Sequence, residues 1–462
     1  MTRAGGIGTF LERRSLVLAL GLVVIASIRI ASTYRVFSFT IDEPGHFACG
    51  LEYLSKHVYR YLTEQPPLAQ AAIALPPYLA GVRPLGGEEY NLEGRNVILR
   101  SRRPNRTLAL MRLGILPFFW LACGVVYLWC RRHFAGAVAP LAVALFTLLP
   151  PVLAHAGLAC TDMALAACLG AAFLALILWA ESPASSRWKR GALLGVAAAL
   201  AALSKFTALL YLPAAAAIVL LFYLAVERPG LRKLAALVRE RAATFAFAVL
   251  VGALVIWAGY LFSFGKVPAW NIKLPAPEFF DGLLAAQSHN RRGRPSYLLG
   301  HYSLTGWWYY FPVALVKTPI AFLVLLALGT YTCCRKFSIA ACRLPLAFCL
   351  GILLPAMTGQ VDIGVRTSCR CTSAFRSLPQ WDWTAWRARK AGSWARRQRS
   401  CFCYGWPARG PFAIPTTCHT STNSPGASRP ESWWTPISIG GRIPSGWAGA
   451  YGSWACKRFP SC

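Results

Sequence analysis

The chain has 462 residues, of which 56% are hydrophobic and 14% are charged, and its mean hydropathy is +0.45. A soluble domain carries roughly 25% charged residues, so the composition excludes an ordinary soluble protein and predicts an all-α polytopic membrane protein. The formal charge is +31. Because the basic excess lies mostly in loops beside apolar segments and in the C-terminal tail, no nucleic-acid partner is expected.

Apolar segments long enough to cross a membrane recur along the chain. Most of them approach the roughly 20 residues that a spanning helix needs. The predicted spans are residues 15–31, 108–130, 138–154, 163–180, 192–203, 207–226, 245–262, 312–331 and 340–357. The segment 69–82 is predicted to be interfacial or re-entrant.

Basic residues set the expected orientation, because cytoplasmic loops are enriched in lysine and arginine. Arg13 and Arg14 precede the first span, and further basic clusters follow at intervals of two spans. The N-terminus is therefore expected in the cytoplasm, and the loops at 32–46, 155–162 and 263–308 are expected outside. One basic group falls on the outer side: Arg95, Arg100, Arg102, Arg103 and Arg106. These arginines either depart from the rule or bind an anionic group.

Two acids and a histidine, Asp42, Glu43 and His46, follow the first span. Ionisable groups at a membrane edge are costly and usually functional, which predicts a catalytic site here. The alternative is that an acid beside Pro44 caps the following helix. If a helix starts here, all three side chains can share one face and hold a divalent metal ion. For His46 the alternative is a hydrogen-bonded interfacial histidine.

The chain changes character after Arg366. The segment 367–462 lacks an apolar run of spanning length and is crowded with tryptophan and cysteine. It is interpreted as an extracytoplasmic cysteine-rich domain, as a zinc module, or as the product of a shifted reading frame. The CxC pairs do not have the CxxC spacing of common zinc sites. A one-base shift near Arg366 permits Ile-Leu-Pro-Val-Tyr-Val in place of the residues that start at Thr367, so we favour a frameshifted, poorly ordered tail.

Several motifs occur in order along residues 10–366. They are Asp42-Glu-Pro-Gly-His46, Gln65-Pro-Pro-Leu-Ala69, His155-Ala156 with Thr161-Asp162, Ser204-Lys-Phe-Thr207, Tyr297-Leu-Leu-Gly300, Lys317-Thr-Pro319 and Ile363-Gly-Val-Arg366. This set resembles glycosyltransferase family 39, which includes the protein mannosyltransferases and the aminoarabinose transferases. The shifted-frame peptides resemble the way in which bacterial members continue after Gly-Val-Arg.

The resemblance implies a GT-C-type bundle of transmembrane helices with extracytoplasmic loops, formed by residues 1–366. It also implies transfer of a mannose-like hexose or an aminopentose, with inversion, from a polyprenyl phosphate to an acceptor protein or lipid. A bacterial inner membrane is the expected location. The alternatives are an inactive pseudogene product of the same family and a polytopic transporter or lipid flippase.

The resemblance assigns roles to particular residues. Asp42, with Glu43 beside it, and Asp162 are the expected catalytic carboxylates, although Thr161-Asp162 also suits a helix N-cap. Lys205 is expected to bind the donor phosphate, with a snorkelling lysine as the alternative. The other expected phosphate ligands are Arg291, for which a solvated loop is the alternative, and Arg366.

Overall fold

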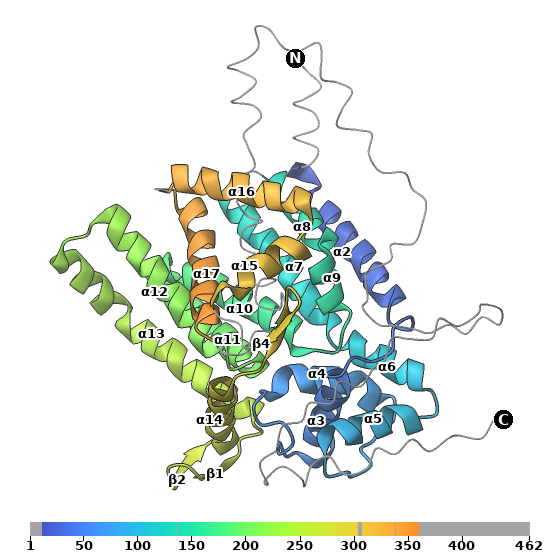
Figure 1. Ribbon diagram of the computed structural model, residues 1–462. Helices are drawn as coiled ribbons and strands as arrows, with labels where there is room; N and C mark the ends of the chain where they lie inside the picture. The colour runs from blue at the N-terminus through green and yellow to red at the C-terminus, as the bar shows by residue number, and fades with distance from the viewer. Residues whose placement is uncertain (1–11, 135, 304–306, 338, 360–462) are drawn as a thin grey trace, which may run out of the picture. The chain divides into compact units, whose positions relative to one another are not determined.

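The computed structural model describes residues 12–134, 136–303, 307–337 and 339–359, and helices dominate the fold of this part of the chain (Figure 1). The helices are α2 (Ser15–Ser32), α3 (Glu43–Lys56), α4 (Pro67–Leu79), α5 (Tyr90–Arg100), α6 (Pro104–Leu113), α7 (Leu116–His133), α8 (Val138–Leu148), α9 (Pro150–Ala156), α10 (Thr161–Ala180), η1 (Ala184–Ser186), α11 (Arg187–Ser204), α12 (Ala208–Glu227), α13 (Leu231–Gly259), α14 (Pro277–Arg292), η2 (Trp307–Tyr309), α15 (Tyr310–Lys317), α16 (Ile320–Arg335) and α17 (Ala340–Met357).

In the described part of the chain, the strands form two short antiparallel hairpins. One pairs β1 (Phe264–Val267) with β2 (Ile272–Pro275), and the other pairs β3 (Ser296–Leu298) with β4 (His301–Ser303).

Within the described residues, six helices are long and apolar enough to cross a membrane. They are Ser15–Ser32, Pro104–His133, Thr161–Ala180, Ala208–Glu227, Leu231–Gly259 and Ala340–Met357. These helices confirm the predicted spans at 15–31, 108–130, 163–180, 207–226, 245–262 and 340–357. The predicted span at 138–154 is a broken pair, α8 and α9, bent by 71°. Pro150 and Pro151 follow the break and explain it, because proline cannot continue the hydrogen bonding of the preceding helix.

Two predictions of spans need correction. The segment 312–331 is not one helix: α15 ends at Lys317 and α16 begins after Pro319, so each piece is too short to span alone. The segment 192–203 lies in α11, which starts with Arg187 and is not one of the six spanning candidates. Helix α11 packs against α10 and α13, and Leu194, Ala201 and Leu203 are buried there.

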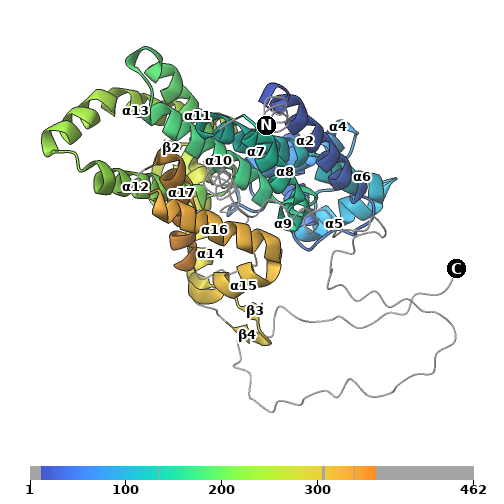
Figure 2. The same ribbon diagram turned by 90° about the horizontal axis from the view of Figure 1, so that it is seen from above.

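Helix α10 lies within the main core and positions the site. Most of its residues are buried, including Leu165, Leu169 and Phe173. Helices α7 and α11 pack against it, and α17 lies nearby in the view from above (Figure 2). Because α10 is buried nearly all round, the polar residues at its N-terminal end are held in a fixed place.

Helices α3 to α6 form a layer at one end of the bundle (Figure 1). Two close backbone approaches hold α3 against α4 and against α5. A Cβ at Gly50 would lie 2.0 Å from the carbonyl oxygen of Gln70, and a Cβ at Gly94 would lie 1.8 Å from that of Pro44. Only glycine permits such contacts. Helix α3, which begins at the predicted Asp-Glu site, is therefore clamped between α4 and α5. Helix α4 covers most of the segment 69–82 and, with 13 residues, is too short to span.

Candidate active site

Glu43 is the best-anchored residue at the start of α3. Glu43 is fully buried and forms a bidentate ion pair with Arg112 of α6. The side chain of Arg112 is 1% exposed. Arg112 Nε lies 2.8 Å from Glu43 Oε1, and Nη2 lies 2.9 Å from Oε2. The backbone N–H groups of Ala159 and Thr40 donate to Oε1 and Oε2 at 2.9 and 2.7 Å. A carboxylate has about four acceptor positions, and here all of them are in use.

Arg112 is equally well satisfied. Its remaining N–H groups donate to the carbonyl oxygens of Tyr34, Phe37 and Ser38 at 2.9, 3.0 and 2.9 Å. All five guanidinium donors therefore have acceptors. The carbonyl groups belong to the segment between α2 and Asp42, so one arginine fixes the path of that segment.

This geometry changes the role of Glu43. The sequence predicts a catalytic carboxylate at this position, but a buried carboxylate whose acceptor sites are all bonded has no free position for a substrate proton. Glu43 acts as an anchor in this structure. Its bond to Ala159 ties the start of α3 to the loop before α10.

Asp42 lies directly before Glu43, at the N-cap position of α3. It is half-buried, and its side chain makes no capping hydrogen bond. The capping interpretation of this acid is therefore wrong. Because Glu43 is held in place, the backbone of Asp42 is held with it.

Asp162 and Lys205 form a second charged pair. Lys205 Nζ lies 3.1 Å from Asp162 Oδ1, and the side chains are 20% and 4% exposed, in that order. Asp162 lies in the first turn of α10, where the helix dipole favours a negative charge. His155 Nδ1 lies 3.9 Å from the other carboxylate oxygen. The N-cap of α10 is Cys160, with no side-chain cap, so the alternative in which Thr161 caps this helix is wrong.

The two charged pairs belong to one region. The hydrogen bond between Glu43 and Ala159 joins the start of α3, beside Asp42, to the loop before α10. Asp162 follows three residues after Ala159, in the first turn of α10. The structure thus brings together Asp42, Glu43, Asp162 and Lys205, which the sequence places up to 163 positions apart.

His46 belongs to a different network. Gln70 Nε2 donates to His46 Nδ1 at 3.4 Å. The single hydroxyl proton of Tyr59 is shared between Gln70 Oε1 and the carbonyl oxygen of Gln65. Burial raises the pKa of Tyr59 well above 10.0, so the hydroxyl stays protonated and remains a donor.

The sequence predicts that Asp42, Glu43 and His46 can hold a divalent metal ion. Within the residues that the structure describes, no group of three or more His, Cys, Asp and Glu side chains is placed to hold a metal ion. Glu43 is bonded to Arg112 and His46 to Gln70, so these side chains do not fit a divalent ion shared with Asp42.

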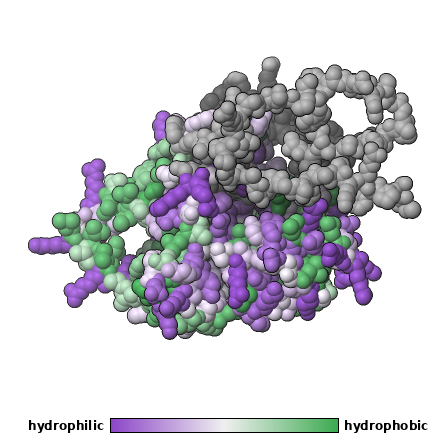
Figure 3. Space-filling model, turned by 60° about the horizontal axis from the view of Figure 1, so that its bottom comes forward, coloured by the Kyte–Doolittle hydropathy of each residue, from purple (hydrophilic) through white to green (hydrophobic). Residues whose placement is uncertain are grey.

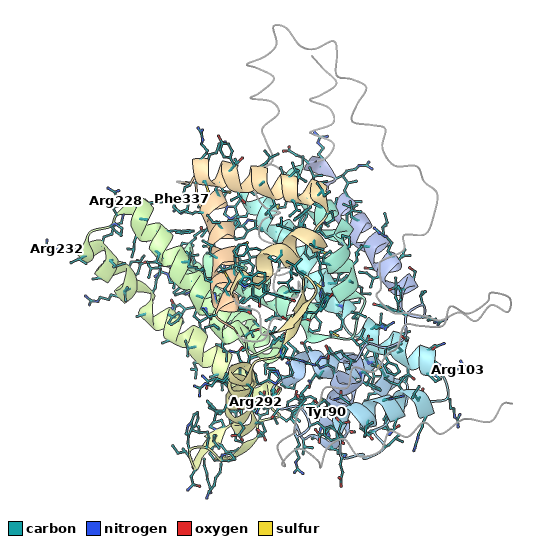
Figure 4. The ribbon with its side chains drawn as sticks, viewed as in Figure 1. Tyr90, Arg103, Arg228, Arg232, Arg292 and Phe337 are labelled. Atoms are coloured by element: carbon teal, nitrogen blue, oxygen red, sulfur yellow. The ribbon has the colours of Figure 1, made fainter. Side chains whose placement is uncertain are left out.

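Arg291 lies in the last turn of α14 and is exposed. Its neighbours reach the loop before α4: His289 Nδ1 lies 3.1 Å from Glu64 Oε2, and Arg292 Nη2 lies 3.7 Å from Glu64 Oε1. Figure 4 shows Arg292 on this helix. Arg366 and the tail at 367–462 lie outside the described residues, so their predicted roles stay predictions.

Sequence reasoning missed two residues, Arg112 and His155, as members of the site. Arg112 carried a usable signal, because it is a charged residue inside a predicted span and such residues generally have buried partners. His155 stood in a motif, but its proximity to Asp162 depends on the path of the loop between α9 and α10.

Comparison with known proteins gives a family and a fold. Residues 23–272 match the family model of dolichyl-phosphate-mannose-protein mannosyltransferase. No curated protein matches the sequence. Among solved structures, ArnT from Cupriavidus metallidurans bound to undecaprenyl phosphate is similar, with 14% identity and a TM-score of 0.54, and its apo form gives 17% and 0.53. Each match covers 78% of this chain and 59% of the ArnT chain. The prediction of a GT-C-type helix bundle is confirmed.

Proposed function

Because the chain belongs to the dolichyl-phosphate-mannose-protein mannosyltransferase family, we propose that it transfers a sugar from a polyprenyl-phosphate donor to an acceptor hydroxyl. The sugar is a mannose-like hexose or an aminopentose, and the acceptor is a protein or a lipid. The similar ArnT structure holds undecaprenyl phosphate, which supports a lipid-linked donor.

The proposed reaction exchanges two bonds at the anomeric carbon. The acceptor oxygen forms a bond to this carbon while the bond from the carbon to the donor phosphate oxygen breaks. Attack from the opposite side inverts the configuration. The polyprenyl phosphate leaves as a stable anion, so a strong general acid is not needed. The acceptor hydroxyl loses its proton, so one carboxylate base is needed.

One observation carries the proposal: Asp42 is a half-buried carboxylate directly beside a buried and fully bonded anchor, Glu43. A base must be held in place and must still reach solvent or substrate. Glu43 and Arg112 hold the backbone of Asp42 in place. The partial exposure of Asp42 gives its carboxylate access to solvent or substrate. We assign Asp42 as the base and Glu43 as its positioning residue.

Lys205 is the proposed cation for the donor phosphate. It keeps a fifth of its side-chain surface exposed while it contacts Asp162, so a phosphate can approach from the open side. Asp162 then restrains the ammonium group and balances its charge before the donor binds. Arg291 and Arg366 are proposed as further phosphate contacts.

The proposed site faces the outside of a bacterial inner membrane, with the N-terminus in the cytoplasm. This orientation is supported by Arg13 and Arg14 before α2 and by Arg131 and Arg132 at the end of α7. It gives the site access to lipid-linked sugars and to acceptors outside the cytoplasm.

The proposal is tested by expressing the chain in membranes and adding polyprenyl phosphates that carry labelled mannose or aminoarabinose. The expected result is label on a protein or lipid acceptor, with inverted configuration at the anomeric carbon. A second chain, with one base restored before the codon for Thr367, is assayed beside the first. Activity of the restored chain alone identifies the 462-residue chain as an inactive product of this family.

Two results overturn the proposal. One is intact labelled donor with both chains, which excludes transfer of these sugars. The other is movement of the labelled lipid across the bilayer without cleavage, which identifies a flippase.

A further inference from the structure

Helices α5 and α6 carry a concentrated positive charge that the proposed reaction does not use. Residues 95–106 contain five arginines and no acid. We call this group the α5–α6 arginine patch: Arg95, Arg100, Arg102, Arg103 and Arg106. All five side chains are exposed. In the part of the chain that the structure describes, the ion pairs involve other cations.

Two acids that precede the patch, Glu89 and Glu93, are already bonded elsewhere. Glu93 is buried and accepts a hydrogen bond from the backbone N–H of Gly87 at 2.9 Å. Glu89 caps α5 by accepting from the backbone N–H groups of Asn91 and Leu92. The positive charge of the patch therefore faces outward without a counter-charge from its own segment.

The patch lies where a spanning helix begins. Pro104–His133 has 30 residues, which is about 45 Å at 1.5 Å per residue. A bilayer with its headgroups is about 40–45 Å thick, so the two ends of this span reach headgroup level. Arg102 and Arg103 lie directly before the span, and Arg106 lies in its first turn. Figure 4 shows Arg103 projecting away from the bundle.

Helix α5 has the pattern of a helix that lies on a membrane surface. Its inner face packs on α3, and Gly94, Val97 and Ile98 are buried on that helix. Its outer face combines the arginines with Leu92 and Leu99, which are 54% and 52% exposed. Mixed hydrophilic and hydrophobic side chains also show on the molecular face in Figure 3. Basic residues interleaved with leucine favour the boundary between headgroups and acyl chains.

We propose that the α5–α6 arginine patch binds the phosphates of anionic phospholipids in the leaflet on this side of the membrane. Arginine is suited to this task because its planar fork matches a phosphate with two hydrogen bonds. This binding holds α5 against the surface of the bilayer. Because α5 holds α3 through the contact between Gly94 and Pro44, the lipid also steadies the start of α3.

The proposal is tested with the full chain in vesicles of phosphatidylcholine that contain a little photoactivatable phosphatidylglycerol. Crosslinked peptides are mapped by mass spectrometry at low crosslinking yield. The expected result is crosslinks at residues 95–106. Each arginine near an anionic surface is worth about a fivefold change in affinity, so R103Q/R106Q reduces the yield there by about 25-fold.

Two variants control for charge and for fold. K266Q/K273Q removes the same formal charge from the β1–β2 hairpin, where the two exposed lysines lie opposite each other, and leaves the yield at 95–106 unchanged. R103K/R106K keeps the charge and retains most of the yield. The crosslinking measurement does not require sugar transfer. Its result therefore tests lipid binding separately from the proposed activity.

Three results overturn the proposal. The first is absence of crosslinks at 95–106 in the unmodified chain. The second is an unchanged yield in R103Q/R106Q, and the third is an equal yield with photoactivatable phosphatidylcholine. Crosslinks that are displaced by an added acidic protein but not by unlabelled phosphatidylglycerol identify a protein partner and also contradict it.

Discussion

Replacing Glu43 by glutamine removes the counter-charge of Arg112 and keeps the size of the side chain. The change affects four donors: two from Arg112 and the backbone N–H groups of Ala159 and Thr40. A glutamine oxygen accepts two of them, but its NH₂ group then faces the other two donors. Because both side chains are buried, water cannot reach the guanidinium group of Arg112 to compensate for the lost carboxylate.

The expected magnitude follows from that burial. Breaking a buried ion pair by removing one partner costs about 3–5 kcal/mol. Even at about 2 °C per kcal/mol, the low end for domains of 150–250 residues, this lowers the midpoint of thermal unfolding by about 6–10 °C. The assay is the unfolding midpoint of the detergent-solubilised chain, measured beside sugar transfer.

The matched control is Glu181→Gln. Glu181 pairs with Arg132, but both side chains are about two-fifths exposed, and an exposed pair is worth about 0–1 kcal/mol. An unchanged midpoint and unchanged transfer in Glu43→Gln would refute the anchoring role. An unchanged midpoint with transfer abolished would instead restore Glu43 to a direct part in the chemistry.

Further predictions concern single residues around the site. Lys205→Met raises the donor concentration needed for half-maximal transfer, and Lys205→Arg retains most of the affinity; equal kinetics for both variants would exclude a role for the charge. Gly94→Ala forces a Cβ to 1.8 Å from the Pro44 carbonyl oxygen and costs at least about 1–3 kcal/mol. In contrast, Gly230→Ala, where a Cβ meets nothing within 4 Å, leaves the unfolding midpoint unchanged. Desolvation and the charge of Glu278 raise the pKa of Asp281 above 3.8, so its stabilising contribution falls as pH rises through that range. Asp281→Asn is therefore expected to unfold at an equal or higher temperature at pH 7 and to match the wild type below pH 3.8; a lower midpoint at pH 7 would contradict this.

Much of the fold follows from composition and length alone. Long apolar runs at 163–180 and 207–226 become α10 and α12, because a continuous apolar stretch of this length has few other stable forms in a membrane. Breaks were harder to predict. The run at 312–331 reads as one span by hydropathy, yet Lys317-Thr318-Pro319 ends one helix and starts another.

The site was predictable only in part. The acids at 42 and 43 stand out in the sequence because charge at a membrane edge is costly. Which of them is buried depends on Arg112, 69 residues further along the chain, and sequence spacing does not give that contact. Likewise, Lys205 reads as a free cation, and only the packing of α10 on α11 brings it to Asp162.

The rate of sugar transfer by Asp42→Asn tests the central claim most directly. A positioned general base contributes about 10²–10⁴-fold, so the variant should lose transfer by that factor while its unfolding midpoint stays close to that of the wild type. Asp281→Asn makes the same chemical change on α14 and should transfer at the wild-type rate. Transfer by Asp42→Asn at the wild-type rate would contradict the assignment of Asp42 as the base.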